Sequence, residues 1–253
     1  YNIMSILYSG KSDGLVSLDQ MKQLPPAQVL GPRHNPQPFH IFIDNVIDGL
    51  QDRGYEITES EFSLTDENNK FFGAVKIDHS DLGYSEDHSY IIGLRGSHDQ
   101  TFGRGLACGT QVMVCSNLCF SGSDGQWSTK QTLNIGYRTE LRLDRIFDRL
   151  PMINNKTEKL FDKLKQTEIT IETGDHYLAQ MAYDNVINGR ELSKAVREWR
   201  DPSFDDHKKY GQSLWQLFNG CTEAIKPTGK RANNVMVKDK SIRIFDQFQR
   251  LAA

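Results

Sequence analysis

The sequence predicts an α+β fold, in which an antiparallel meander sheet of four to five strands is preceded by one helix and followed by several helices. Two observations predict it. Apolar, strand-like runs follow one another through short polar connections between residues 55 and 115, as in an antiparallel meander. After residue 136 the apolar positions change to three- and four-residue spacing, which is typical of helices. Strands first and helices afterwards is the α+β arrangement.

Residues 1–38 are predicted to form a Pro-rich N-terminal arm. Proline lacks a backbone N–H and breaks helices, so this composition excludes a long helix. We expect the arm either to lie on the domain or to reach a neighbouring subunit. The prolines are Pro25, Pro26, Pro32, Pro36 and Pro38.

Residues 39–136 are predicted to form a sheet-rich core. Its first element is an amphipathic helix over 39–53, which Gly54 ends at a left-handed C-terminal position. A polar tetrapeptide at 66–69 predicts a tight hairpin between the first two strands. The expected strands cover residues 55–64, 70–77, 89–94 and 106–115.

Residues 137–253 are predicted to form a helical part, packed on the same core. Its first element is expected to be one long helix, because apolar residues recur at helical steps without interruption through this region. The expected helices cover residues 139–166, 174–188, 191–199, 212–225 and 233–251.

Net charge and composition limit the classes of function that the chain can have. The 253 residues carry a net charge of −3 with a pI of about 6.2, which is not the signature of a general nucleic-acid binder, so any DNA contact must come from a local patch. No apolar run approaches the roughly 20 residues of a membrane span. The first residues lack the pattern of a signal peptide. We therefore expect no membrane segment and a cytoplasmic location.

The four cysteines predict free, reduced thiols. They are too few and too clustered for a secreted disulfide scaffold. Cys115 and Cys119, with Cys108 and His98, lack the second closely spaced ligand pair of a structural zinc site. We expect no metal and no cofactor.

In the stretch from 91 to 122 two strand-like runs enclose a polar, Gly-rich connection, which contains Ser97, His98 and Asp99, a candidate polar site. Adjacent side chains diverge, whereas a catalytic triad assembles from distant segments. A turn in which Ser97 or Asp99 accepts backbone N–H groups and opens a short helix is therefore favoured, and no catalytic residue is assigned. Arg95 and Arg104 flank this loop and are candidate phosphate contacts, with a salt-bridged or solvated arginine as the alternative.

The runs GLRGSHD and VMVCSNLCFSG in this region, together with FFGAVKI before them and LWQLFNGCTEAIK after them, form a recognisable pattern. On these runs the chain resembles, from about residue 36 to residue 226, the phage- and plasmid-encoded family known as domain of unknown function 932. Gly96 and Ser116 depart from the family's usual Asn and Asp, and the chain lacks the family's His within 129–132. The resemblance implies a mobile-element protein in the cytoplasm of a bacterial host cell, with roles in DNA entry, recombination or counter-defence as candidates. The matching positions are Gly93, Leu94, Arg95, Ser97, His98, Asp99, Val114, Cys115, Asn117, Phe120, Ser121 and Gly122.

The strongest physical signal is an arginine stripe, defined as Arg138, Arg142, Arg145 and Arg149. Steps of four, three and four residues place these side chains on one side of a helix. An acidic stripe follows its own line, so the helix puts like charges at i and i+4, which destabilises it by a few tenths of a kcal/mol per pair. The stripes therefore need partners outside the helix: in the same domain, across a homo-oligomer interface, or on an external polyanion. The acidic residues are Glu140, Asp144 and Asp148.

The resulting hypothesis is a non-enzymatic DNA-binding protein that binds or anneals single strands in recombination, replication or DNA entry. A meander that leads into a long basic helix is similar in outline to phage single-strand annealing proteins. Lys130, Lys230 and Arg231 are further candidate phosphate contacts. The alternative is a counter-defence protein that inhibits a host immune protein or sequesters its nucleotide signal. A third candidate is an enzyme that uses His98, Asp99 and Cys115.

Overall fold

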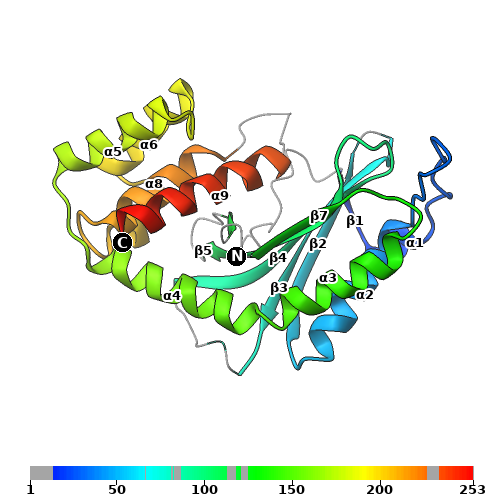
Figure 1. Ribbon diagram of the computed structural model, residues 1–253. Helices are drawn as coiled ribbons and strands as arrows, with labels where there is room; N and C mark the ends of the chain where they lie inside the picture. Colours follow the sequence, from blue (N-terminus) through cyan, green and yellow to red (C-terminus); the bar gives the residue numbers. More distant parts are fainter. Residues whose placement is uncertain are drawn as a thin grey trace.

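The computed structural model describes residues 14–65, 67–80, 82, 87–112, 118–120, 125–226 and 234–252. In these ranges the chain has an α+β fold built on one seven-stranded antiparallel sheet (Figure 1). The predicted fold class is confirmed. The strand number exceeds the predicted four to five, because a short strand from the arm and two short strands after the meander also join the sheet.

The long strands form a meander in chain order, and the last two strands share one edge. β6 and β7 both pair with β5, along different parts of its length. The β2–β3 hairpin turns through Glu67 and Asn68, whose positive φ angles of 54° and 67° suit a tight hairpin. The strands are β1 (Leu15–Val16), β2 (Glu56–Thr65), β3 (Lys70–Asp78), β4 (His88–Ser97), β5 (Arg104–Val112), β6 (Leu118–Phe120) and β7 (Gln126–Thr129).

The described part of the N-terminal arm lies on the domain. β1 pairs with β2, and the short helix α1 (Leu18–Lys22) is capped by Ser17, whose side chain accepts from the N–H of Gln20. Met21 of α1 is buried in the core. Further along, His34 forms an isolated bridge with Thr132. Of the two alternatives for the arm, the structure therefore supports the one in which residues 14–38 lie on the domain.

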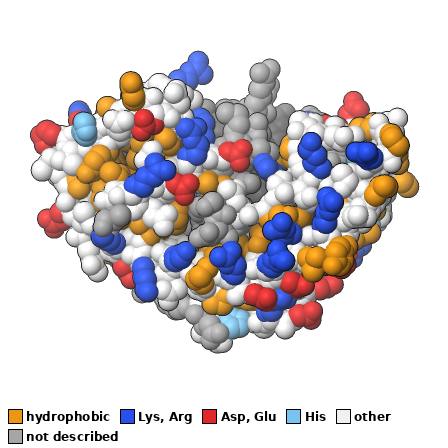
Figure 2. Space-filling model, in the orientation of Figure 1, with side chains coloured by type: hydrophobic (Ala, Val, Ile, Leu, Met, Phe, Trp, Pro, Cys, Tyr) orange, Lys and Arg blue, Asp and Glu red, His pale blue; other side chains and the backbone are white. Residues whose placement is uncertain are grey.

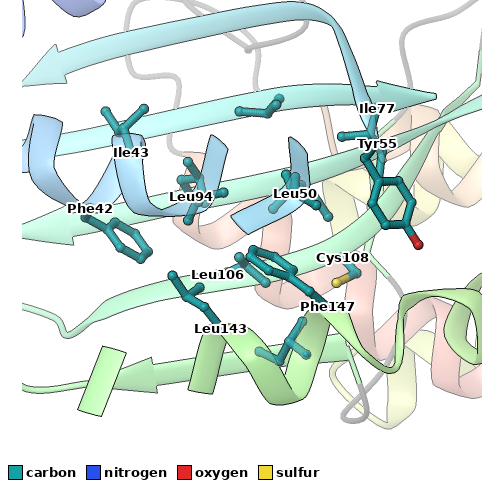
Figure 3. Close-up of a cluster of buried hydrophobic side chains, with 14 of the residues drawn as sticks. Phe42, Ile43, Leu50, Tyr55, Ile77, Leu94, Leu106, Cys108, Leu143 and Phe147 are labelled. Carbon is teal, nitrogen blue, oxygen red and sulfur yellow. The ribbon is translucent and has the colours of Figure 1, made fainter. Parts of the chain in front are cut away.

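Helix α2 (Phe39–Gln51) lies over the sheet and buries one face against it. Figure 3 shows Phe42, Ile43 and Leu50 of α2 in a cluster with side chains from β4 and β5 and from the next helix. Gly54, with a φ of +81°, follows the helix in the left-handed region, as its glycine predicted.

The predicted single helix over 139–166 is wrong. The chain instead forms α3 (Ile135–Phe147) and α4 (Leu150–Gln166), which meet at a bend (Figure 1). Pro151 explains the break, because it cannot donate a hydrogen bond to the carbonyl of Phe147 and its ring crowds that carbonyl. The joint residues Asp148 and Arg149 keep right-handed helical φ and ψ angles, so the helical phase of α3 carries over into α4 although the axis bends.

The remaining helices pack into a second hydrophobic cluster around Trp199, Trp215 and Phe218. Leu150 and Ile153 of α4 belong to the sheet cluster, whereas Leu160, Phe161 and Leu164 belong to this second cluster, so α4 joins the two. Among the described residues, no helix is both long and apolar enough to cross a membrane. The helices are α5 (Ile171–Tyr183), α6 (Gly189–Arg200), α7 (Asp205–Lys208), α8 (Leu214–Ala224) and α9 (Asn234–Leu251).

Polar contacts also fix α4 to the start of β4. His88 Nε2 lies 2.7 Å from Glu158 Oε1, and the Tyr90 hydroxyl donates to the same carboxylate. Lys165 Nζ lies 2.7 Å from Asp87 Oδ2. Burial alone would raise the pKa values of Asp87 and Glu158, but these hydrogen bonds lower them. The position of α4 against the sheet is therefore held by charge-assisted hydrogen bonds as well as by apolar packing.

Candidate nucleic-acid interface

The arginine stripe lies on the surface. Arg138, Arg142 and Arg145 project from α3, Arg149 stands at the bend before α4, and all four side chains are exposed. Within the part of the chain that the structure describes, none of the four forms an ion pair or a side-chain hydrogen bond. No described carboxylate of the domain therefore pairs with the arginine stripe.

Two residues of the acidic stripe on the same helix, Asp144 and Asp148, do have a described partner. Arg53, just after α2, places Nη2 3.0 Å from Asp144 Oδ1 and 2.9 Å from Asp148 Oδ1. Its guanidinium also lies 5.7 Å from the centre of the Phe147 ring. Burial alone would lower the pKa of Arg53, but its hydrogen bonds to the two carboxylates raise it. These contacts turn the acidic side of α3 towards α2.

The line of basic residues continues beyond the arginine stripe. Lys156, Lys159 and Lys163 of α4 are exposed and follow Arg149 at steps of seven, three and four residues. The buried faces of α3 and α4 share one helical phase, so these lysines stay on the side that carries the arginines. We call the arginine stripe and these three lysines the basic flank. Figure 2 shows Lys and Arg side chains along α4 and α3, with acidic side chains below those on α3.

The sequence pattern of the arginine stripe alone, which ends at Arg149, does not include these lysines. The signal was present, since the alternation of three- and four-residue steps continues to Lys163 with Met152 as its one uncharged member. Exposed apolar side chains lie beside the basic flank. Tyr137 is 68% exposed and Leu141, one turn later, is 42% exposed. An exposed aromatic ring beside arginines is a feature of surfaces that bind single strands.

Arg104 is not a phosphate contact, and the prediction is wrong for this residue. Its side chain is only 1% exposed, and it donates to the side-chain and backbone oxygens of Gln37 at 2.9 and 3.2 Å. It also lies over the Phe42 ring, and burial lowers its pKa to about 10. The cause is strand alternation, because Arg104 points to the same side of β5 as the core residues Leu106 and Cys108.

The other predicted contacts divide into three groups. Arg95 is partly buried, lies 5.5 Å from the centre of the Phe102 ring and 3.9 Å from Asp239, and so is engaged within the protein. Lys130 is exposed where β7 ends, before α3. Lys230 and Arg231 lie outside the described residues, as does Cys115.

Ser97 and Asp99 form the predicted polar turn. The Ser97 hydroxyl donates to the carbonyl oxygen of Phe102 at 2.8 Å, and its oxygen accepts from the N–H of the same residue at 3.2 Å. Asp99 accepts from the N–H of Thr101 at 3.0 Å and lies 3.3 Å from Lys70 Nζ. Burial alone would raise the pKa of Asp99, but these hydrogen bonds lower it to about 2. The expected short helix is absent, since residues 98–102 form bends.

His98 belongs to the core of the turn. Its ring stacks on Phe39 with the ring centres 3.7 Å apart, and Nε2 lies 3.0 Å from the carbonyl oxygen of Gln37. Burial lowers the pKa of His98, so the ring is kept neutral. The three polar side chains thus have structural partners, and they do not converge on a common point as a catalytic triad does.

The two cysteines whose side chains are described, Cys108 and Cys221, are free and buried, and burial raises the pKa of each thiol to about 12. A thiol with so high a pKa is a poor nucleophile. Among the described residues there is no group of three or more His, Cys, Asp or Glu side chains that could hold a metal ion.

Comparison of the chain with family models, curated proteins and solved structures finds no match. The resemblance to the domain of unknown function 932 therefore rests on the quoted sequence runs. Of these runs, GLRGSHD forms the end of β4 and the polar turn, next to the segment where Lys130 leads into α3.

Proposed function

We propose that this chain is a non-enzymatic protein of a phage or plasmid that binds single-stranded DNA in the cytoplasm of the bacterial host, and that it serves annealing during recombination, replication or DNA entry. The observation that carries the proposal is the contrast between the two sides of α3. The carboxylates Asp144 and Asp148 have Arg53 as their partner, whereas the arginine stripe is exposed without a described partner.

The basic flank suits a flexible polyanion. At about 1.5 Å per residue, Arg138 to Arg149 spans roughly 16 Å, and the bent path to Lys163 spans up to about 37 Å. Lysine and arginine side chains that contact phosphates displace condensed counterions, and this entropy drives binding of any sequence. Because the protein's net charge is −3, the attraction is local to this flank. Tyr137 offers a ring on which a base can stack without readout of its edges.

The test is a titration of a fluorescent oligothymidylate at two salt concentrations. We expect salt-sensitive binding that weakens in Arg142→Ala and Arg145→Ala, with the salt slope reduced by about 0.7 for each arginine removed. The matched control is Arg190→Ala, since Arg190 is an exposed arginine on α6 without a described side-chain partner. It should bind as the parent does. Equal losses in all three variants, or no binding by the parent, would contradict the proposal.

A second function, inhibition of a host immune protein, is favoured by one observation. Leu133, Tyr137 and Leu141 are exposed apolar residues close together at the start of α3, and such groups often mark protein interfaces. If the parent protein binds no oligonucleotide and the arginine stripe also adds no stability, this second function or a homo-oligomer interface would be favoured.

A further inference from the structure

A pocket of about 450 Å³ lies where the N-terminal arm meets the polar turn. Its walls come from three segments that are distant in sequence: residues 30–34 of the arm, residues 100–103 after β4, and residues 130–132 after β7. The third segment leads directly into α3. The pocket therefore stands at the N-terminal end of the basic flank, with Lys130 in its wall eight residues before Arg138.

The pocket is basic. Arg33 and Lys130 line it, both are exposed, and neither forms an ion pair or a side-chain hydrogen bond with a described residue. The described lining contains no Asp or Glu. The nearest acidic residue in sequence, Asp99, is engaged by Lys70 at 3.3 Å. An anion in this pocket would meet two cations without competition from the protein's own carboxylates.

His34 adds a buried donor to this wall. Its side chain is only 7% exposed, and Nδ1 accepts from the N–H of Leu30 at 3.1 Å. Because Nδ1 accepts, the ring proton must be on Nε2. That Nε2 is buried and has no partner among the described residues. A buried N–H without an acceptor is unfavourable, so a ligand whose acceptor reaches Nε2 would satisfy it.

The remaining walls suit a nucleoside rather than a bare anion. Phe102 lines the pocket, and its ring is held in place by the Phe72 ring, with the centres 5.6 Å apart. Leu30 and Pro32 add apolar surface from the arm. A volume of this size lies within the range of small-molecule sites and far exceeds the need of a single phosphate ion.

We propose that this pocket binds a nucleoside monophosphate unit, with Arg33 and Lys130 on the phosphate, His34 Nε2 donating to an oxygen or nitrogen acceptor, and Phe102 against the base or sugar. The inference rests on the proposed function, because the pocket lies at the end of the basic flank. The occupant of the pocket would therefore be the terminal nucleotide of a bound strand. A free nucleotide presents the same chemistry, and the experiment separates the two sources.

The experiment compares three oligothymidylates of equal length, with a 5′-phosphate, a 3′-phosphate or no terminal phosphate, and measures binding of thymidine monophosphate by calorimetry. One terminal phosphate should raise the affinity of the parent about five- to tenfold, as two charge-assisted contacts allow. Arg33→Ala and Lys130→Ala should abolish this preference. Arg142→Ala should weaken all three oligonucleotides but keep the preference, and Arg190→Ala should change neither.

His34→Phe keeps an aromatic ring and removes the donor, so it should lower the affinity for thymidine monophosphate if its unfolding curve matches that of the parent. Arg33 and Lys130 are exposed, so their variants test the pocket even where His34→Phe fails to fold. Salt-sensitive binding without a terminal-phosphate preference and without mononucleotide binding would overturn the inference and leave the proposed function standing. Lys130-dependent binding of the mononucleotide alone would sustain the pocket, identify a free nucleotide as its ligand and overturn the proposed function.

Discussion

Asp148 Oδ1 accepts two hydrogen bonds from the guanidinium of Arg53, at 3.0 Å from Nε and 2.9 Å from Nη2. Arg53 follows the end of α2 and Asp148 follows the end of α3, so the pair ties these two helix ends together. The same Nη2 reaches Asp144 at 3.0 Å. This link fixes the rotation of α3 about its axis, with its acidic side towards α2 and the arginine stripe towards solvent.

Removal of Arg53 should destabilise the protein. Arg53→Ala leaves Asp144 and Asp148 as unpaired like charges on one side of α3. Both carboxylates are well exposed, so each ion pair contributes only a fraction of a kcal/mol, and we expect a total loss of about 1 kcal/mol. Urea unfolding measures it. Arg53→Lys keeps the charge but loses the two-pronged contact. Its unfolding midpoint should therefore lie between those of the parent and Arg53→Ala. An unchanged midpoint for Arg53→Ala would show that the pairs contribute nothing.

Removal of arginines from the stripe should not destabilise the protein, in contrast to removal of Arg53. Arg142→Ala relieves a like-charge contact with Arg138 at i and i+4, and Arg145→Ala relieves one with Arg149. Stability should stay constant or rise by a few tenths of a kcal/mol. Thermal melts at low salt check this. A fall as large as that of Arg53→Ala would mean that the stripe is paired within the protein, and the main support for DNA binding would be lost.

The long strands of the sheet could be predicted because each is an apolar run bounded by a short polar connection. The strands expected at 55–64 and 70–77 differ from β2 and β3 by one residue at each changed end. The helix over 139–166 failed because the apolar spacing runs unbroken through Pro151, although a proline interior to a helix is a known break.

Arg104 was misplaced for a different reason. Gly103-Arg104-Gly105 was interpreted as a loop because of its glycines, but it begins β5. The glycine at 105 serves close packing, since a Cβ there would stand 2.6 Å from the carbonyl oxygen of Trp127 on β7. The pocket could not be predicted either, because its three walls come together only through tertiary contacts of the arm, such as the bridge between His34 and Thr132.

Arg104→Ala should cost about 2–4 kcal/mol, because it opens a cavity beside Phe42 and leaves the acceptors of Gln37 unpaired. Oligonucleotide affinity of the folded fraction should not change. Arg104→Met fills more of the space and carries no charge. Because burial already disfavours the charged arginine, as its pKa of about 10 shows, Met should cost less than Ala. Denaturant unfolding and a titration of each variant provide both readouts, and a DNA defect at unchanged stability would contradict this account.

The buried thiols should be inert in the folded protein. Burial raises the pKa of Cys108 and Cys221 to about 12, so almost no thiolate forms near neutral pH. In a Cys115→Ser, Cys119→Ser variant, Ellman's reagent should detect no fast thiol under native conditions and two in urea. A thiol that reacts rapidly without denaturant would show that one of these side chains is accessible.

Asp99 should contribute stability that depends on pH. Its folded-state pKa of about 2 lies below the ordinary value of 3.8, so the carboxylate stabilises the fold fully above about pH 4, and this contribution is lost as the pH falls towards 2. Asp99→Ala should therefore cost about 1 kcal/mol at pH 6, through loss of the bond from Thr101 N–H and of the contact with Lys70. In urea unfolding, the difference in the free energy of unfolding between the parent and Asp99→Ala should narrow between pH 4 and pH 3. Asp162→Ala, which removes an exposed carboxylate of α4 without a described partner, should change stability little at pH 6. If Asp99→Ala keeps its stability but loses oligonucleotide or mononucleotide binding, the residue serves the ligand and not the turn.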